Sequence, residues 1–163
     1  MQLRYLVLCV ATLAATAACE STSDPIIGET GGGGALTVAQ ASGNWNITVT
    51  RTSNLPCSGA LASGQILATH IEVLSDGTLT TPSTWQNPIV GGFQNLSGTV
   101  NLTTGALDLI FAGGVGGAME LFPGTMSSSG TITGATITDP APGSSQVFGS
   151  NGCQYTASGT KTN

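Results

Sequence analysis

The sequence carries very little charge. Charged residues make up 7% of its 163 residues, against about 25% in an average soluble domain. After residue 18 the only basic residues are Arg51 and Lys161. A phosphate backbone needs a basic stripe, so we expect no nucleic-acid partner. Polarity comes instead from Thr, Ser, Asn and Gly, a composition common in exported β proteins and unlike that of disordered tails.

Groups that perform chemistry are also scarce. His70 is the only histidine, and strand alternation puts it and Glu72 on the outward face. Together they would supply two metal ligands, where a site needs at least a third. The chain contains no G-x-S-x-G, H-E-x-x-H, C-x-x-C or G-x-G-x-x-G motif. The other carboxylates of the domain are scattered: Asp76 and Asp139 in predicted turns, Asp108 and Glu120 at outward strand positions. We therefore predict no enzymatic activity, no catalytic residue, no metal site and no cofactor.

The N-terminal segment is typical of an export signal. Arg4 provides a short positive region, and residues 5–18 follow without a charge and end in small residues. The run is too short to cross a bilayer as a helix, and no stop-transfer charges follow it. We therefore predict a signal peptide over residues 1–18.

Cys19 stands directly after this segment. The sequence Ala17-Ala18-Cys19 resembles the lipobox of bacterial lipoproteins. The resemblance implies that Cys19 is lipidated and becomes the new N-terminus, which makes the membrane a partner of the mature protein. Residue 16 is Thr, where the family usually has Leu, and ordinary cleavage after Ala15-Thr16-Ala17 is the alternative.

The cysteine count favours lipidation. Cys9 leaves with the signal, so the mature chain holds Cys19, Cys57 and Cys153. An odd thiol is a hazard in an oxidising compartment, and lipidation of Cys19 removes it. We predict a disulfide between the remaining two. Residue 20 is Glu, not the Asp that marks inner-membrane retention in many enteric bacteria, so we expect a location in the outer membrane of a bacterial cell envelope.

The rest of the chain divides into a tether and one domain. Residues 19–42 contain a Ser/Thr cluster, Pro25 and four consecutive glycines at 31–34, which predicts a flexible tether. From residue 43 to residue 163 the pattern has a period of two, as in Trp45, Ile47 and Val49, and no stretch longer than a turn shows helical spacing. This segment is predicted to be a single all-β domain.

Turn signals indicate how the strands are connected. Gly-containing turns separate seven to nine strands, a pattern that predicts an antiparallel meander of about eight strands closing as an up-and-down β-barrel. A two-sheet β-sandwich is the alternative. A bridge between Cys57, just past the first strand, and Cys153, at the start of the last, would tie the ends of the fold together. It would contribute about 4–5 kcal/mol as an upper figure.

Gly43-Asn44-Trp45 opens the first strand and resembles the G-x-W signature of lipocalins and related barrels. The resemblance covers three residues. The T-D-Y motif, the Arg of the last strand and the C-terminal helix of that family are not found here. It implies a barrel with Trp45 at one end.

Two functions remain open. In the first, the barrel mouth holds a small, largely apolar ligand at one barrel end, close to residues 113–117, and the protein performs no chemistry on it. The candidate lining residues are Trp45, Trp85, Phe93, Phe111 and Tyr155. In the second, the domain is a structural or adhesive surface protein with a filled core, since eight-stranded barrels are often just wide enough for their own side chains. An empty or a filled interior decides between them.

Overall fold

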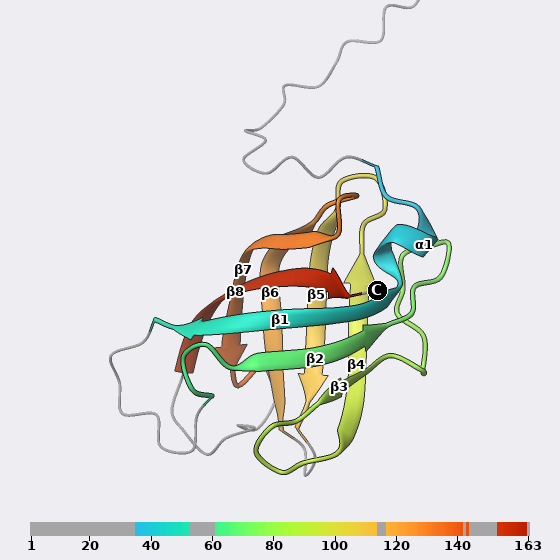
Figure 1. The fold of residues 1–163 in the computed structure, drawn as a ribbon. Helices are drawn as coiled ribbons and strands as arrows, with labels where there is room; N and C mark the ends of the chain where they lie inside the picture. Colours follow the sequence, from blue (N-terminus) through green and yellow to red (C-terminus); the bar gives the residue numbers. More distant parts are fainter. Residues whose placement is uncertain (1–34, 53–60, 114–116, 142, 144–152, 163) are drawn as a thin grey trace, which may run out of the picture.

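The computed structural model describes residues 35–52, 61–113, 117–141, 143 and 153–162 and shows a closed antiparallel barrel (Figure 1). Its strands are β1 (Gly43–Arg51), β2 (Ile66–Ile71), β3 (Thr84–Gln86), β4 (Phe93–Val100), β5 (Ala106–Ala112), β6 (Ala118–Met126), β7 (Thr131–Asp139) and β8 (Cys153–Thr162). They follow one another around the barrel in sequence order, and β1 pairs with β8. The predicted up-and-down meander is confirmed, and the ring of paired strands rules out two separate sheets.

Each strand has an inward and an outward row of side chains. Successive Cβ atoms on a strand point to opposite faces, and β8 shows this most regularly. Its inward residues are buried and the residues between them are exposed; the inward row is Cys153, Tyr155, Ala157 and Gly159. The inward rows of the strands gather into one hydrophobic cluster inside the barrel.

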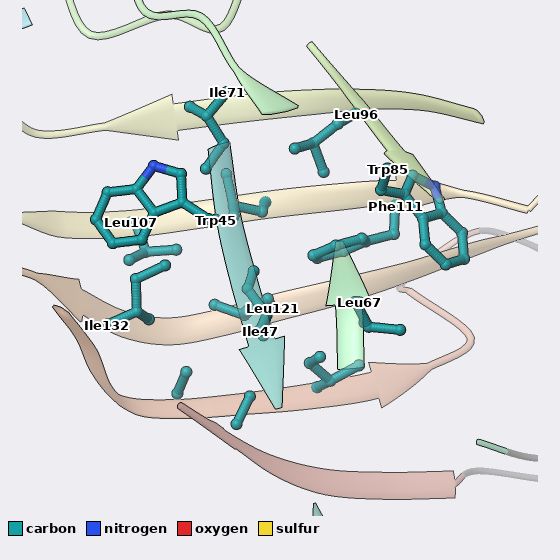
Figure 2. Packing of buried hydrophobic residues seen from close by; sticks show 14 of the residues in the cluster. Trp45, Ile47, Leu67, Ile71, Trp85, Leu96, Leu107, Phe111, Leu121 and Ile132 are labelled. Atoms are coloured by element: carbon teal, nitrogen blue, oxygen red, sulfur yellow. The ribbon is translucent and has the colours of Figure 1, made fainter. Parts of the chain in front are cut away.

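The two tryptophans lie on opposite sides of this cluster (Figure 2). Trp45, near the start of β1, donates its indole N–H to the carbonyl oxygen of Ala41 at 3.1 Å. Trp85, on β3, donates to the carbonyl oxygen of Ala112 at the end of β5, at 2.9 Å. The Trp85 and Phe111 rings also pack edge to face, with centroids 5.5 Å apart and planes at 85°. Each large ring is thus both buried and hydrogen-bonded.

Glycines at inward positions make room for larger neighbours. A Cβ at Gly159 would come within 3.1 Å of Ile132, and one at Gly124 within 3.0 Å of Leu121. The barrel interior therefore alternates small and large residues, as a filled barrel requires. Phe122 and Pro123 are both exposed, so the alternation of β6 slips there by one residue, and the β5–β6 register shifts nearby.

The segment before β1 belongs to the folded domain. Residues 35–42 were assigned to the tether, yet Leu36 and Ala41 are buried in the core cluster. The helix α1 (Val38–Ala41) begins with a capping box, in which Thr37 and Gln40 each bond the other's backbone N–H. The Lys161 ammonium donates to the carbonyl oxygens of Ala39 and Gln40 at 2.7 and 3.1 Å. The folded domain thus includes residues from 35 onward, eight before the predicted boundary.

The turn predicted at Asp76 is present. Gly77 has φ of +87°, and a Cβ there would lie 2.2 Å from the carbonyl oxygen of Val100, so only glycine fits without strain. Asp76 accepts a hydrogen bond from the backbone N–H of Thr78 at 2.9 Å, which holds the pKa of that carboxyl below its usual value. Within the described part of the chain, none of the helices has the length and apolar character needed to cross a membrane.

Candidate functional site

The five aromatic residues predicted to line one pocket do not come together. Trp45, Trp85, Phe111 and Tyr155 are at most 1% exposed and belong to the core cluster. Phe93 is 73% exposed on the outside of β4. Position 93 shares its outward parity with Asn95 and Ser97, so its ring cannot enter the interior. The prediction is corrected accordingly: four of these residues fill the barrel and the fifth lies outside it.

The glycine-rich connection predicted to border the ligand joins β5 to β6. The backbone N–H of Gly113 donates to the carbonyl oxygen of Gly117 at 2.7 Å, and residues 114–116 lie outside the described residues. Of the grooves on the described surface, four that we describe border neither of these two glycines. A ligand at this loop stays a prediction, because the middle of the loop lies outside the described residues.

A shallow groove of about 220 Å³ lies on the outer surface of the barrel beside Phe93. Its lining residues are Asn44, Trp45, Asn46, Ala68, Thr69, His70, Phe93 and Thr162. The side chains of Trp45 and Thr69 are buried inward, so these two contribute backbone. Ala68, opposite Asn46 in the β1–β2 register, has the shortest outward side chain of the set and leaves the floor open.

His70 connects two other polar side chains at this groove. Its Nδ1 lies 2.8 Å from Oδ1 of Asn44, the residue opposite it on β1. Its Nε2 lies 3.1 Å from Oε1 of Glu72. The predicted outward position of His70 and Glu72 is confirmed. The two contacts place the ring between the Asn44 amide and the Glu72 carboxylate. In the part of the chain that the structure covers, no group of three or more His, Cys, Asp and Glu residues could hold a metal ion.

Several polar side chains of the groove have hydrogen-bonding groups without a side-chain partner among the described residues. Apart from the contact with His70, the Asn44 amide has no side-chain partner among the described residues, and neither do the Asn46 amide and the Thr162 hydroxyl. Amides and hydroxyls both donate and accept hydrogen bonds. The groove thus presents a mixed set of donors and acceptors beside one exposed phenyl ring.

The groove lies at one edge of a larger uncharged surface, here called the hydroxyl face. It consists of the outward side chains of β7, β8 and β1, strands that lie side by side in Figure 1. These are Thr131, Thr133, Thr136, Thr138, Gln154, Thr156, Ser158, Thr160, Thr162, Asn44, Asn46, Thr48 and Thr50. Thr160 stands opposite Thr131 on one side and Asn46 on the other, so polar rows run across the strands.

The connection from β3 to β4 exposes further apolar side chains next to Phe93. Ile89 is 48% and Val90 62% exposed. The buried Asn87 accepts hydrogen bonds from the backbone N–H groups of both through Oδ1, at 3.0 and 3.2 Å. Its own N–H donates to the carbonyl oxygen of Gly92 at 3.1 Å. These bonds hold the connection, and the strand that begins with Phe93, in one shape.

The cysteines predicted to be bridged or lipidated are described only in part. Cys153 is fully buried at the first position of β8. Cys57 and Cys19 lie outside the described residues, so the disulfide and the lipidation stay predictions.

The prediction that Asp139 lies in a turn is wrong. Asp139 is the last residue of β7, fully buried and opposite Cys153. Burial raises the pKa of Tyr155, and the Asp139 carboxylate raises it further.

Comparisons of the chain with protein-family models, with curated proteins and with solved structures gave no match. The site therefore has to be interpreted from its own residues. Sequence reasoning missed Asn44, Asn46 and Thr162 as a set, because these residues meet only when β8 closes against β1. The one signal in the sequence was that strand alternation puts all three side chains on the outside of the barrel.

Proposed function

We propose that this chain is a lipid-anchored protein of a bacterial cell envelope whose barrel serves as an adhesive or structural surface and catalyses no reaction. One observation carries the proposal. The apolar side chains of the strands gather into one buried cluster inside the barrel, and the open amides and hydroxyl of the groove lie on its outside. A barrel of this kind contacts other material with its outer surface.

The filled interior argues against a small apolar ligand inside the barrel. A ligand pocket has a volume of about 300 Å³ or more. The positions expected to surround it hold Trp45, Trp85 and Phe111, which are buried in one cluster. A ligand would have to displace a packed side chain, at the cost of the hydrogen bonds that both indoles make.

The anchor rests on Ala17-Ala18-Cys19, which lies outside the described residues. Between Cys19 and the first described residue, a coil of residues 20–34 would span about 20 Å root-mean-square. Such a tether holds the barrel clear of lipid headgroups while leaving its sides accessible. The hydroxyl face suits contact with hydrated material, because its hydroxyls and amides exchange water for other polar partners without a charge to desolvate.

The anchor is tested by expressing the full chain in a bacterial host that processes lipoproteins. Wild type is expected in the membrane fraction, with a lipid-modified N-terminus at Cys19 by mass spectrometry. Cys19→Ala is expected in the soluble fraction. An unmodified N-terminus at Ala18 in a membrane-free fraction would refute the anchor.

The surface role is tested by the retention of protein-coated beads under flow on hydroxylated glass, on purified cell-wall material and on bare polystyrene. At least one surface should retain wild-type beads. Retention should fall for Thr156→Lys with Thr160→Lys on the hydroxyl face, and persist for the matched pair Thr99→Lys with Thr103→Lys, which is exposed elsewhere. Equal loss in both pairs, or no retention at all, contradicts the proposal.

The alternative function, binding of a small apolar ligand inside the barrel, is tested separately. Apolar small molecules are screened against the full chain by thermal shift and tryptophan fluorescence, since both indoles lie in the core. A ligand of the interior would stabilise the fold by about 2.7 kcal/mol at a hundredfold excess over its Kd. We expect no such stabilisation, and a confirmed apolar ligand would replace the surface role with the interior one.

A further inference from the structure

We propose that the groove beside Phe93 binds a neutral polysaccharide chain, with the phenyl ring as a stacking platform and the open amides and hydroxyl as its hydrogen-bonding partners. The inference rests on the proposed surface function and names the class of ligand. Four features carry it: the exposed ring, the unpaired polar groups, the absence of Lys, Arg, Asp and Glu from the lining, and the continuity of the groove with the hydroxyl face.

The ring is placed as a platform. At 73% exposure, Phe93 is the most exposed of the large hydrophobic side chains described. It stands at the first position of β4, opposite Gln86 on β3, directly after the connection held by Asn87. The backbone under the ring is therefore ordered before any ligand arrives, which lowers the entropy cost of binding. The face of an aromatic ring is negative and attracts the positive C–H edge of an apolar surface, such as the C–H face of a pyranose.

The polar groups match the rest of a sugar ring. A hydroxyl donates one hydrogen bond and accepts two, so it pairs best with groups that do both. Asn46 and Thr162 are such groups, and Asn44 keeps its amide nitrogen as a donor while Oδ1 contacts His70. A purely apolar ligand would cover these groups without replacing their water, which costs free energy for each one.

The charge of the lining excludes other ligands. No Lys, Arg, Asp or Glu lines the groove, and the adjacent Glu72 is paired with His70. A phosphate or carboxylate ligand would find no Lys or Arg there, and His70 already faces the Glu72 carboxylate. The neutral, hydroxyl-rich ligand is the one that leaves no group in the groove unmatched.

The shape of the groove favours a polymer. A groove of about 220 Å³ is smaller than the ~300 Å³ of an ordinary ligand pocket, so one sugar ring fills it and gains little affinity. Thr162 and Asn46 belong both to the groove and to the hydroxyl face, where Thr160 stands opposite Asn46. Neighbouring sugar units of one chain can therefore contact this face together, and linked contacts multiply affinity.

The test is isothermal titration of the full chain with cello-, chito- and xylo-oligosaccharides of six units, with their monosaccharides, and with a charged oligogalacturonate. At least one neutral hexasaccharide should bind, more tightly than its monosaccharide and than the charged oligomer. Phe93→Ala should weaken binding about tenfold, and Ala68→Trp should abolish it by filling the floor. The matched control Phe122→Ala removes a phenyl ring that is 57% exposed on β6 and should leave the affinity unchanged. Melting temperatures verify that all three variants remain folded.

Absence of binding by every neutral hexasaccharide overturns the inference, as does binding that survives Phe93→Ala or Ala68→Trp. Retention of beads on a surface without saccharide binding would leave the surface function standing and refute only the ligand class. In that case the exposed Ile89, Val90 and Phe93 would remain as an apolar contact for a protein partner. If both assays fail, the surface function falls as well.

Discussion

The inward and outward rows of the same strands are specified in different ways. Inside β8, Tyr155 and Gly159 each fit one set of neighbours: a Cβ on Gly159 would press against Ile132. Outside β8, Thr156, Ser158 and Thr160 repeat one kind of chemistry, and any of them could exchange with another. Substitutions at inward positions should therefore change stability, and substitutions at outward positions should change binding.

Trp85→Ala should cause the largest loss. The side chain is fully buried against Phe111, and its removal leaves a large cavity and an unpaired carbonyl oxygen at Ala112. We expect the free energy of unfolding to fall by about 3–5 kcal/mol. Urea unfolding measures it. The outward counterpart Phe93→Ala should change stability by no more than about 0.5 kcal/mol, and comparable losses in the two variants would break the separation of the rows.

Loss of the predicted disulfide should come next. We expect Cys57→Ala and Cys153→Ala to lower the free energy of unfolding by similar amounts, about 2–4 kcal/mol, because each removes the same covalent constraint on the unfolded chain. Thiol labelling of the unfolded, unreduced chain should find neither cysteine free. If Cys153→Ala is costly and Cys57→Ala is neutral, burial of Cys153 is the cause and the bridge does not exist.

Gly159→Ala should destabilise the barrel by overpacking. The added methyl would lie 3.1 Å from Cβ and Cδ1 of Ile132, and we expect a cost of about 1–3 kcal/mol. Ile132→Val removes Cδ1, so a double-mutant cycle should recover part of that loss. The neighbouring outward change Ser158→Ala is the control and should be neutral. If the losses of unfolding free energy in the two single variants simply add in the double variant, the two residues do not compete for the same space.

Tyr155→Phe should have the smallest effect at neutral pH and a clear one in alkali. Burial raises the pKa of Tyr155 above its unfolded value of about 10. The folded state thus favours the neutral phenol, whose contribution to stability is fully present below pH ~10 and is lost as pH rises through the raised pKa. Unfolding free energies measured from about pH 8 upward should decline more steeply for wild type than for Tyr155→Phe. Parallel declines would show that the phenol is not the titrating group.

The strand pattern was predictable because it is local. Alternation and Gly-containing turns placed the strands, and Gly77 has the positive φ that its turn required. The choice between barrel and sandwich was not local, because it depends on pairing between β1 and β8, more than 100 residues apart. The helix α1 was missed although Thr37 and Gln40 form a recognisable capping box, since one helical turn is too short to show a 3.6-residue period.

The candidate site was predictable only in part. Parity correctly placed His70 and Glu72 on the outside. Phe93 was grouped with the interior aromatics because it is large and apolar, although counting back from the buried Leu96 puts it on the outward row. Exposure of a large apolar residue follows from parity and not from its hydrophobicity. The groove is lined by residues from four strands, β1, β2, β4 and β8. No single segment of the sequence therefore predicts it.

The pairing of the first strand with the last has a consequence for how the chain folds. Asn44 meets Thr162 and Arg51 meets Tyr155, so the final ladder joins residues from opposite ends of the domain and pays the largest loop-closure entropy of any pair in the barrel. Until residues 153–162 arrive, β1 and β7 are two open edges with unsatisfied N–H and C=O groups, each a template for another chain. The strand β8, which is synthesised after β1–β7, is thus the segment that turns an aggregation-prone open sheet into a closed barrel without edges.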